Sequence, residues 1–147
     1  MQEQGYIPKD LSFDEQARTK LISGISKISN AVKSTLGPQG QTVLIESTQH
    51  TQGLTVTKDG VTVAKSIFLI DPVENLAVRM MKQASEKTAN VAGDGTTTAI
   101  VLTEALVKAG QKYIKEGDNT IEIVRDIRWQ GQAILDEIKE RAIPVTD

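Results

Sequence analysis

Two glycines, an aspartate and three consecutive threonines lie together between two helix-like stretches, in the segment NVAGDGTTTAIV from Asn90 to Val101. A helix that begins at Thr96 leaves its first backbone N–H groups without intrahelical partners and presents the positive end of its dipole. A phosphate can bind there, because glycines let the backbone approach it closely. Asp94 would repel that phosphate unless a divalent cation lay between them, so Gly93–Thr98 predicts a Mg-nucleotide site. The alternative is a plain threonine-capped turn between two helices.

Two other glycine-containing segments can contribute to the same site. STLGPQG, from Ser34 to Gly40, predicts a helix end followed by a loop whose backbone amides can meet a ligand. VTKDG places Lys58 and Asp59 at a strand end, where the lysine can pair with phosphate and the aspartate can position water or a cation. Taken alone, the first is a helix stop and the second an ordinary turn. Only their combination with Gly93–Thr98 favours nucleotide binding.

The composition is that of an ordinary folded domain. The chain has 147 residues, of which 39% are hydrophobic and 24% charged, and the aromatic share of 3% predicts a core of aliphatic side chains. The net charge is only −2, and the scattered basic residues form no patch suited to nucleic acid. The sequence has no cysteine, and no apolar run approaches the roughly 20 residues that cross a bilayer. We therefore expect a cytoplasmic protein that binds neither nucleic acid nor membrane.

Apolar spacing predicts the elements of the first half of the chain. A helix should start at a capping box formed by Ser12 and Glu15, continue to Leu36 and stop at Gly37-Pro38. Residues 42–46 and 54–57 should pair as a hairpin, with the only histidine, His50, in its loop. Residues 61–65 are compatible with either a third strand or a short helix.

Three further helices should follow. Asp71-Pro72 is a strong helix start, and the helix should run to about Val91. A second should run from Thr96 to about Lys115, and a third from the cap Asn119 to about Ile143. The expected inner face of the first comprises Leu76, Ala77, Met80, Met81, Ala84, Thr88 and Val91. That of the second comprises Ala99, Leu102, Ala105, Leu106, Ala109 and Tyr113, and that of the third comprises Ile121, Val124, Ile127, Ile134, Leu135 and Ile138.

The motifs TLGPxG, TKDG and AGDGTTT, in this order and at these spacings, resemble the N-terminal part of chaperonins of the bacterial-type sixty-kilodalton heat-shock class. The similarity covers nearly the whole chain, from KDLSFDEQ through LTVTKDGVTVAKSI to GDNTIEIVRDI. It implies a mainly α fold: half of a chaperonin equatorial helical domain with a small β-hairpin, and the start of the intermediate domain at the C-terminus. The implied divisions are an arm at 1–10, the N-terminal half of the ATP-binding equatorial domain at 11–133, and the beginning of the intermediate domain at 134–147.

The resemblance also assigns roles to residues. Thr35, Leu36, Gly37 and Pro38 match the segment that wraps the nucleotide, and Lys58 and Asp59 match positions beside its phosphates. Asp94 matches the Mg²⁺ ligand, and Gly95, Thr96, Thr97 and Thr98 match the phosphate-contacting loop and helix start. Asp59 matches one of two aspartates linked to hydrolysis, the second of which lies in a later part of the family's chain. The implied cofactors are ATP and Mg²⁺, with K⁺ as a further candidate.

The function that the resemblance implies is that of a chaperonin subunit, present here as a truncated fragment. The complete protein would couple ATP hydrolysis to assisted folding within a homo-oligomeric ring, and it would engage unfolded clients and a co-chaperonin through regions absent here. We expect the fragment alone not to be a competent ATPase. The alternative is a truncated, non-catalytic interaction protein that associates with chaperonin subunits. A free-standing phosphoryl-transfer enzyme is disfavoured, because no GxxxxGK[ST] motif is present.

Overall fold

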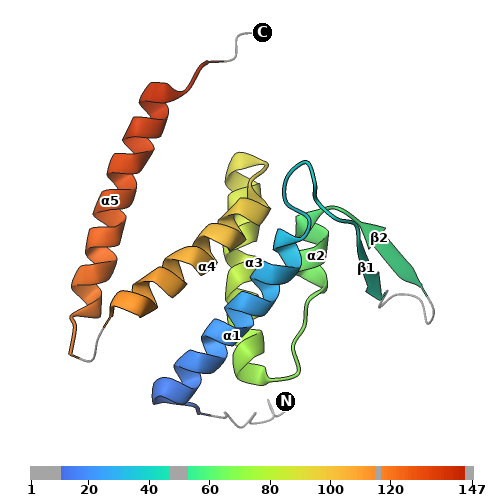
Figure 1. Cartoon of the computed structure of the whole chain (residues 1–147), viewed down its shortest axis with the longest axis horizontal. Coiled ribbons are helices and arrows are strands. Elements are labelled where there is room, and N and C mark those ends of the chain that lie inside the picture. The colour runs from blue at the N-terminus through green and yellow to red at the C-terminus, as the bar shows by residue number, and fades with distance from the viewer. Residues whose placement is uncertain (1–10, 47–52, 115–116, 145–147) are drawn as a thin grey trace, which may run out of the picture. The chain divides into compact units, whose positions relative to one another are not determined.

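The computed structural model describes residues 11–46, 53–114 and 117–144. Within these ranges the fold is mainly α with one small hairpin, as the sequence predicts (Figure 1). The elements are α1 (Asp14–Lys33), β1 (Val43–Glu46), β2 (Leu54–Thr57), α2 (Gly60–Ser66), α3 (Pro72–Ala92), α4 (Thr96–Tyr113) and α5 (Thr120–Arg141). The chain divides into two compact units, Met1–Ala109 and Gly110–Asp147.

The predicted limits of α1 are wrong at both ends. Phe13, not Ser12, is the N-cap, and it forms no side-chain cap bond, so the expected capping box is absent. The helix ends at Lys33, before Leu36, because two hydroxyls fold back onto the last turn. Ser34 Oγ donates to the carbonyl of Ala31, and Thr35 Oγ1 donates to that of Val32, which lets the chain leave the helix early.

The hairpin is confirmed, and it brings the VTKDG segment back to the helices. β1 and β2 pair antiparallel, with Val43 opposite Thr57 and Glu46 opposite Leu54. The expected N-terminal arm and His50 lie outside the described residues.

The segment with two open interpretations is a helix. Asp59 lies in extended backbone, and its carboxylate accepts hydrogen bonds from the N–H groups of Val61 and Thr62, which starts α2. Val63 and Ala64 are buried on its inner side. A strong N-cap therefore outweighs the strand-like alternation of residues 61–65.

The ends of α3 are as predicted, but its inner face is partly wrong. Asp71 accepts from the N–H groups of Val73 and Glu74, and Gly93 closes the helix in the left-handed conformation with φ of 75°. The buried residues are Ala77, Val78, Met81 and Ser85. Four residues expected inside are instead exposed, Met80 to 61%; they are Leu76, Met80, Ala84 and Val91.

Close packing against α1 selects this face of α3. Gly24 of α1 lies directly against α3, so that a Cβ placed on it would come within 2.3 Å of the Glu74 carbonyl oxygen. Glu74 also accepts from Ser23 Oγ at 2.7 Å on the same side of the interface. This approach fixes the rotation of α3 about its own axis, which an apolar pattern alone does not specify.

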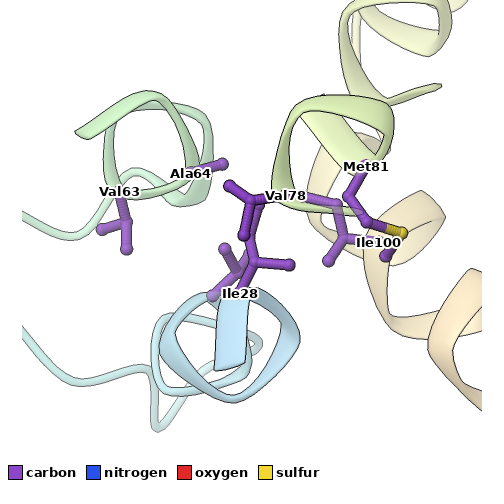
Figure 2. Close-up of a cluster of buried hydrophobic side chains, with 7 residues drawn as sticks. Ile28, Val63, Ala64, Val78, Met81 and Ile100 are labelled. Carbon is purple, nitrogen blue, oxygen red and sulfur yellow. The ribbon is translucent and has the colours of Figure 1, made fainter. Parts of the chain in front are cut away.

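Residues of α1, α2, α3 and α4 form the core of the first unit, and Figure 2 shows their buried side chains. All its members are aliphatic or methionine, in agreement with the low aromatic content. They are Ile28 and Val32 of α1, Val63 and Ala64 of α2, Val78 and Met81 of α3, and Ile100 of α4.

The buried stripe of α4 also differs from the prediction. Thr96, Ile100 and Glu104 are buried at spacings of four, whereas Leu102 and Leu106 are each 56% exposed and Tyr113 is exposed as well. Among the predicted inner residues, Ala105 and Ala109 are also exposed. The predicted inner face of α4 was wrong because no other part of the described structure covers its apolar side chains.

In the second unit, α5 begins at the predicted cap. Asn119 Oδ1 accepts from the N–H groups of Ile121 and Glu122, and the helix ends at Arg141, two residues before the predicted Ile143. None of its residues is buried, so its predicted apolar face is uncovered in this unit. Among the helices of the described ranges, none is long and apolar enough to cross a membrane.

Candidate functional site

The three glycine-containing segments meet at Gly60, the first residue of α2. Gly60 is buried, and a Cβ placed on it would lie 2.1 Å from Thr97 Oγ1 and 3.1 Å from Thr35 Oγ1. Thr97 belongs to the first turn of α4, and Thr35 follows the end of α1. The sequence-distant segments STLGPQG, VTKDG and AGDGTTT therefore share one junction in space, as the nucleotide hypothesis requires.

The segment after α1 is a closed loop with its own backbone bonds. The N–H of Gln41 donates to the Ser34 carbonyl at 2.6 Å, and the N–H of Gly40 donates to the Gly37 carbonyl at 3.0 Å. Gly37 has a φ of 78°, which only glycine adopts readily. A Cβ on Gly40 would lie 2.3 Å from the Thr35 carbonyl oxygen, so the loop is closely packed at Gly40, whereas a Cβ on Gly37 would meet no atom within 4 Å. Leu36 and Pro38 stand exposed on it.

Asp59 is already engaged as the cap of α2. Besides the two N–H groups, its Oδ2 accepts from the hydroxyl of Thr62 at 2.6 Å. The Thr62 hydroxyl is the main cause that lowers the pKa of Asp59, against a smaller opposing effect of burial. The carboxylate is therefore ionised at neutral pH, which suits it to attract a cation or orient water and makes it a weak proton acceptor.

The start of α4 offers unpaired backbone donors. The first bond of its helical ladder runs from the Ala99 N–H to the Gly95 carbonyl. In the described part of the chain, no side-chain or backbone oxygen accepts from the N–H groups of Thr96, Thr97 or Thr98. By contrast, α2, α3 and α5 all have side-chain caps at this position. Three free amides at a helix start form a site for an anion.

Asp94 lies beside these amides and is exposed. Its Oδ1 accepts from the Gly95 N–H at 2.6 Å, and Gly95 itself has a φ of 82°. Within residues 11–46, 53–114 and 117–144, no cluster of three or more His, Cys, Asp or Glu side chains could hold a metal by itself. The donor set fits Mg²⁺ that is also held by phosphate oxygens and water, the usual arrangement for this ion, and does not fit a protein-only metal cage.

The remaining predicted residues are less closely connected. Lys58 and Thr98 are exposed, and no hydrogen bond or ion pair of the described residues joins either of them to another of the three segments. The structure thus brings Thr35, Gly60 and Thr97 together and leaves Lys58 and Thr98 on the surface.

A buried glutamate near this junction was missed by the sequence reasoning. Glu104 of α4 is only 1% exposed, and its carboxylate pairs with Lys33 Nζ of α1 and, at 2.6 Å, with Lys108 Nζ. Burial raises its pKa, but the two lysines, with a smaller contribution from Ser29, outweigh burial and lower the pKa to about 2. Ser29 Oγ lies nearby but forms no regular hydrogen bond in the described structure. The Glu104–Lys108 spacing was visible as an i,i+4 pair, but it indicates a solvated helix face.

We expect the Glu104 carboxylate to stabilise the fold in a pH-dependent way. Its pKa is lower in the folded chain than the ordinary value of 4.5, so its contribution is complete above 4.5 and is lost as pH falls toward 2. Glu104→Gln should therefore cost about 1–3 kcal/mol at pH 7, and this difference should shrink between pH 4.5 and 2. Urea unfolding followed by circular dichroism at several pH values measures it.

The matched control for this prediction is Glu137→Gln, which breaks an exposed pair with Arg141 on α5. That change should cost less than about 1 kcal/mol at every pH. Equal effects of the two substitutions at pH 7 would contradict the assigned role of Glu104.

Comparison with known proteins gives one family and similar solved structures. Residues 28–147 match the TCP-1/cpn60 chaperonin family. Chaperonin gp146 from the bacteriophage EL 2 (Pseudomonas aeruginosa), crystallised in the presence of ATP-BeFx, resembles the chain in two crystal forms. Form II gives 33% identity and a TM-score of 0.77 over 89% of this chain and 22% of that one. Form I gives 32% identity and a TM-score of 0.76 over 90% of this chain and 23% of that one.

Proposed function

Because this chain belongs to the TCP-1/cpn60 chaperonin family, as an N-terminal portion of such a protein, we propose that the junction of α1, α2 and α4 binds ATP together with Mg²⁺. The observation that carries this proposal is the convergence on Gly60, which lies against both Thr35 and Thr97. Packing alone would not require three glycine-containing loops to meet beside a helix start with free amides. The presence of ATP-BeFx with the similar phage chaperonin supports the choice of nucleotide.

The chain's own groups divide the work of binding. The free N–H groups of Thr96–Thr98 would donate hydrogen bonds to phosphate oxygens, with the threonine hydroxyls as further donors. Thr35 also lies against Gly60, so the loop Thr35–Pro38 would wrap the nucleotide there, and the Lys58 ammonium would offset phosphate charge. Asp94 is the residue that would hold Mg²⁺, with K⁺ as a further candidate cation of the site. When bound, Mg²⁺ neutralises charge on the phosphate oxygens.

Asp59 is the residue proposed to act in hydrolysis. Its carboxylate is held in place by Val61, Thr62 and the start of α2, so it can orient a water molecule without moving. The lowered pKa of Asp59 keeps it ionised for this purpose. The chain spans less than a quarter of the phage chaperonin, and we propose that it does not sustain turnover alone.

The role in the complete protein follows from this site. We propose that residues 11–133 form the N-terminal half of the equatorial domain and that residues 134–147 begin the intermediate domain, although α5 passes Ile134 without interruption. In the ring, other chaperonin subunits would be the partners. Nucleotide would bind one conformation of the complete protein better than another and would shift the population toward that conformation. That shift would drive the folding of client proteins.

Asp94→Ala tests the nucleotide site. We expect the 147-residue chain to bind Mg-ATP in the micromolar range, and the substitution or the removal of Mg²⁺ by EDTA to weaken binding at least about tenfold. Isothermal titration calorimetry measures both effects. The control is Asp126→Ala, since Asp126 is an exposed aspartate on α5, and its loss should leave the affinity unchanged. No binding by the folded wild-type chain would contradict the proposal.

The second candidate function is a non-catalytic interaction protein that associates with chaperonin subunits. The exposed apolar side chains of α3 and α4 favour it, among them Leu76, Met80, Leu102 and Leu106. Incorporation of the purified chain into chaperonin rings without any nucleotide affinity would support this function over the first.

A further inference from the structure

We propose that Glu104 is a positioning residue of the nucleotide site. By pairing with Lys33 at the end of α1, it holds the loop Thr35–Pro38 in position beside the start of α4. The inference rests on the proposed function for the meaning of the site. The coupling itself is a property of the chain without ligand.

The Glu104 carboxylate joins two helices at a buried point. Its Oε2 pairs with Lys33 Nζ from α1, and its Oε1 pairs with Lys108 Nζ one turn further along α4. The two lysine side chains are about half exposed, whereas Glu104 is almost completely buried. Burial of a carboxylate is unfavourable unless both oxygens are paired, so removal of either lysine is felt by the same group.

Lys33 and Glu104 are each connected through their own helix to a segment of the site. Lys33 is the last residue of α1, and the next residue, Ser34, provides the carbonyl that closes the loop with Gln41. On α4, the buried stripe runs from Glu104 through Ile100 to Thr96, all on one face of the helix. Since a helix transmits rotation and translation along its axis, the Glu104 contact restrains the first turn of α4 as well.

The position of the charge also distinguishes the two lysines. Lys33 leads directly into the Thr35–Pro38 loop, but Lys108 lies on α4 itself, eleven positions after Thr97. Loss of Lys33 removes the ion pair between α1 and α4, whereas loss of Lys108 leaves that ion pair in place. If Glu104 only required charged partners for its buried carboxylate, loss of Lys33 and loss of Lys108 would affect the loop equally.

Amide hydrogen exchange on the chain without nucleotide tests the inference. Lys33→Met and Glu104→Gln should each speed exchange of the Gly40 and Gln41 amides about tenfold. The Gly40 amide donates to the carbonyl of Gly37 within the loop, and the Gln41 amide donates to the carbonyl of Ser34, which connects Lys33 to the loop. Lys108→Met should change these amides less than about twofold. Equal acceleration by the two lysine substitutions, or no acceleration by Lys33→Met, would overturn the proposal. Both lysines are surface residues, so these variants should fold even where Glu104→Gln does not.

Nucleotide affinity gives a second and separate readout. The Kd for Mg-ATP should rise about tenfold in Lys33→Met and stay within about twofold in Lys108→Met. Lys33→Arg keeps the positive charge, so this variant should have the exchange rate and the ATP affinity of the wild-type chain. If the wild-type chain does not bind ATP, the proposed function fails, but the exchange comparison still decides whether Glu104 positions the loop. If exchange responds to Lys33→Met while affinity does not, the loop is positioned but does not serve the nucleotide, and the inference is overturned.

Discussion

Replacing Gly24 with alanine is expected to destabilise the protein by about 2 kcal/mol, although alanine is the better helix former. A Cβ at this position would lie 2.3 Å from the carbonyl oxygen of Glu74 and 2.9 Å from its carbonyl carbon. These are backbone atoms of α3, so no side-chain rotation can relieve the clash. The two helices would have to separate beside Ile28 and Val78 of the core. Urea unfolding followed by circular dichroism measures the loss.

Gly110 provides the matched control, because it also lies within a helix but has only the Ile114 Cδ1 atom near its missing Cβ, at 4.0 Å. Gly110→Ala should leave the protein unchanged or more stable by up to about 1 kcal/mol, through helix propensity alone. Opposite signs for the two glycines are the expected result. Stabilisation by Gly24→Ala would show that α1 and α3 do not pack as closely as described.

Replacing Gly60 with alanine should weaken Mg-ATP binding at least about tenfold, the largest effect expected from any single methyl group in the site. The new Cβ would lie 2.1 Å from Thr97 Oγ1, 3.3 Å from Thr97 Cβ and 3.1 Å from Thr35 Oγ1. The Thr97 hydroxyl must therefore leave its position, and Thr35 must shift by a few tenths of an ångström. We expect these shifts to disturb the contact between the start of α4 and the loop that follows α1. Isothermal titration calorimetry of the variant against wild type measures the change in Kd.

Thr97→Ala separates this steric effect from a general loss of folding. Removing the Thr97 hydroxyl relieves the shortest contact, so Gly60→Ala should cost much less affinity in the Thr97→Ala background than in the wild-type chain. Circular dichroism of each variant confirms that the helices are retained. Unchanged affinity in Gly60→Ala would mean that the junction of the three segments is not the nucleotide site.

The ends of most elements could be predicted because local chemistry sets them. Asp71 and Asn119 cap their helices as expected, since a short acidic or amide side chain bonds to N–H groups two and three residues ahead wherever the helix packs. Gly93 ends α3 because a left-handed residue is needed there. The prediction failed at Ser12, because α1 begins after Phe13 and no side chain forms a cap bond there.

The faces of α3 and α4 could not be predicted in the same way. The spacing of apolar residues predicts a helix and its apolar stripes, but it does not determine which of two adjacent stripes a neighbouring helix covers. Met81 is buried and Met80 exposed because contact with α1 at Gly24 sets the rotation of α3. Glu104 was missed for the opposite reason. A glutamate four residues before a lysine predicts a solvent-exposed helix face, whereas the approach of Lys33 from α1 compensates the charge of Glu104 and allows its burial.

The sequence by itself determined the mainly helical class, the hairpin, the starts of α3, α4 and α5, and the three glycine-containing motifs whose resemblance led to the chaperonin family. These depend on residues close together in the chain, whose backbone conformations and caps are decided locally. Tertiary structure decided that the three motifs meet at Gly60, which faces are covered, and that Glu104 carries a buried charge between α1 and α4. Such contacts join residues up to 71 positions apart, and their geometry depends on how whole helices pack, which no local pattern encodes.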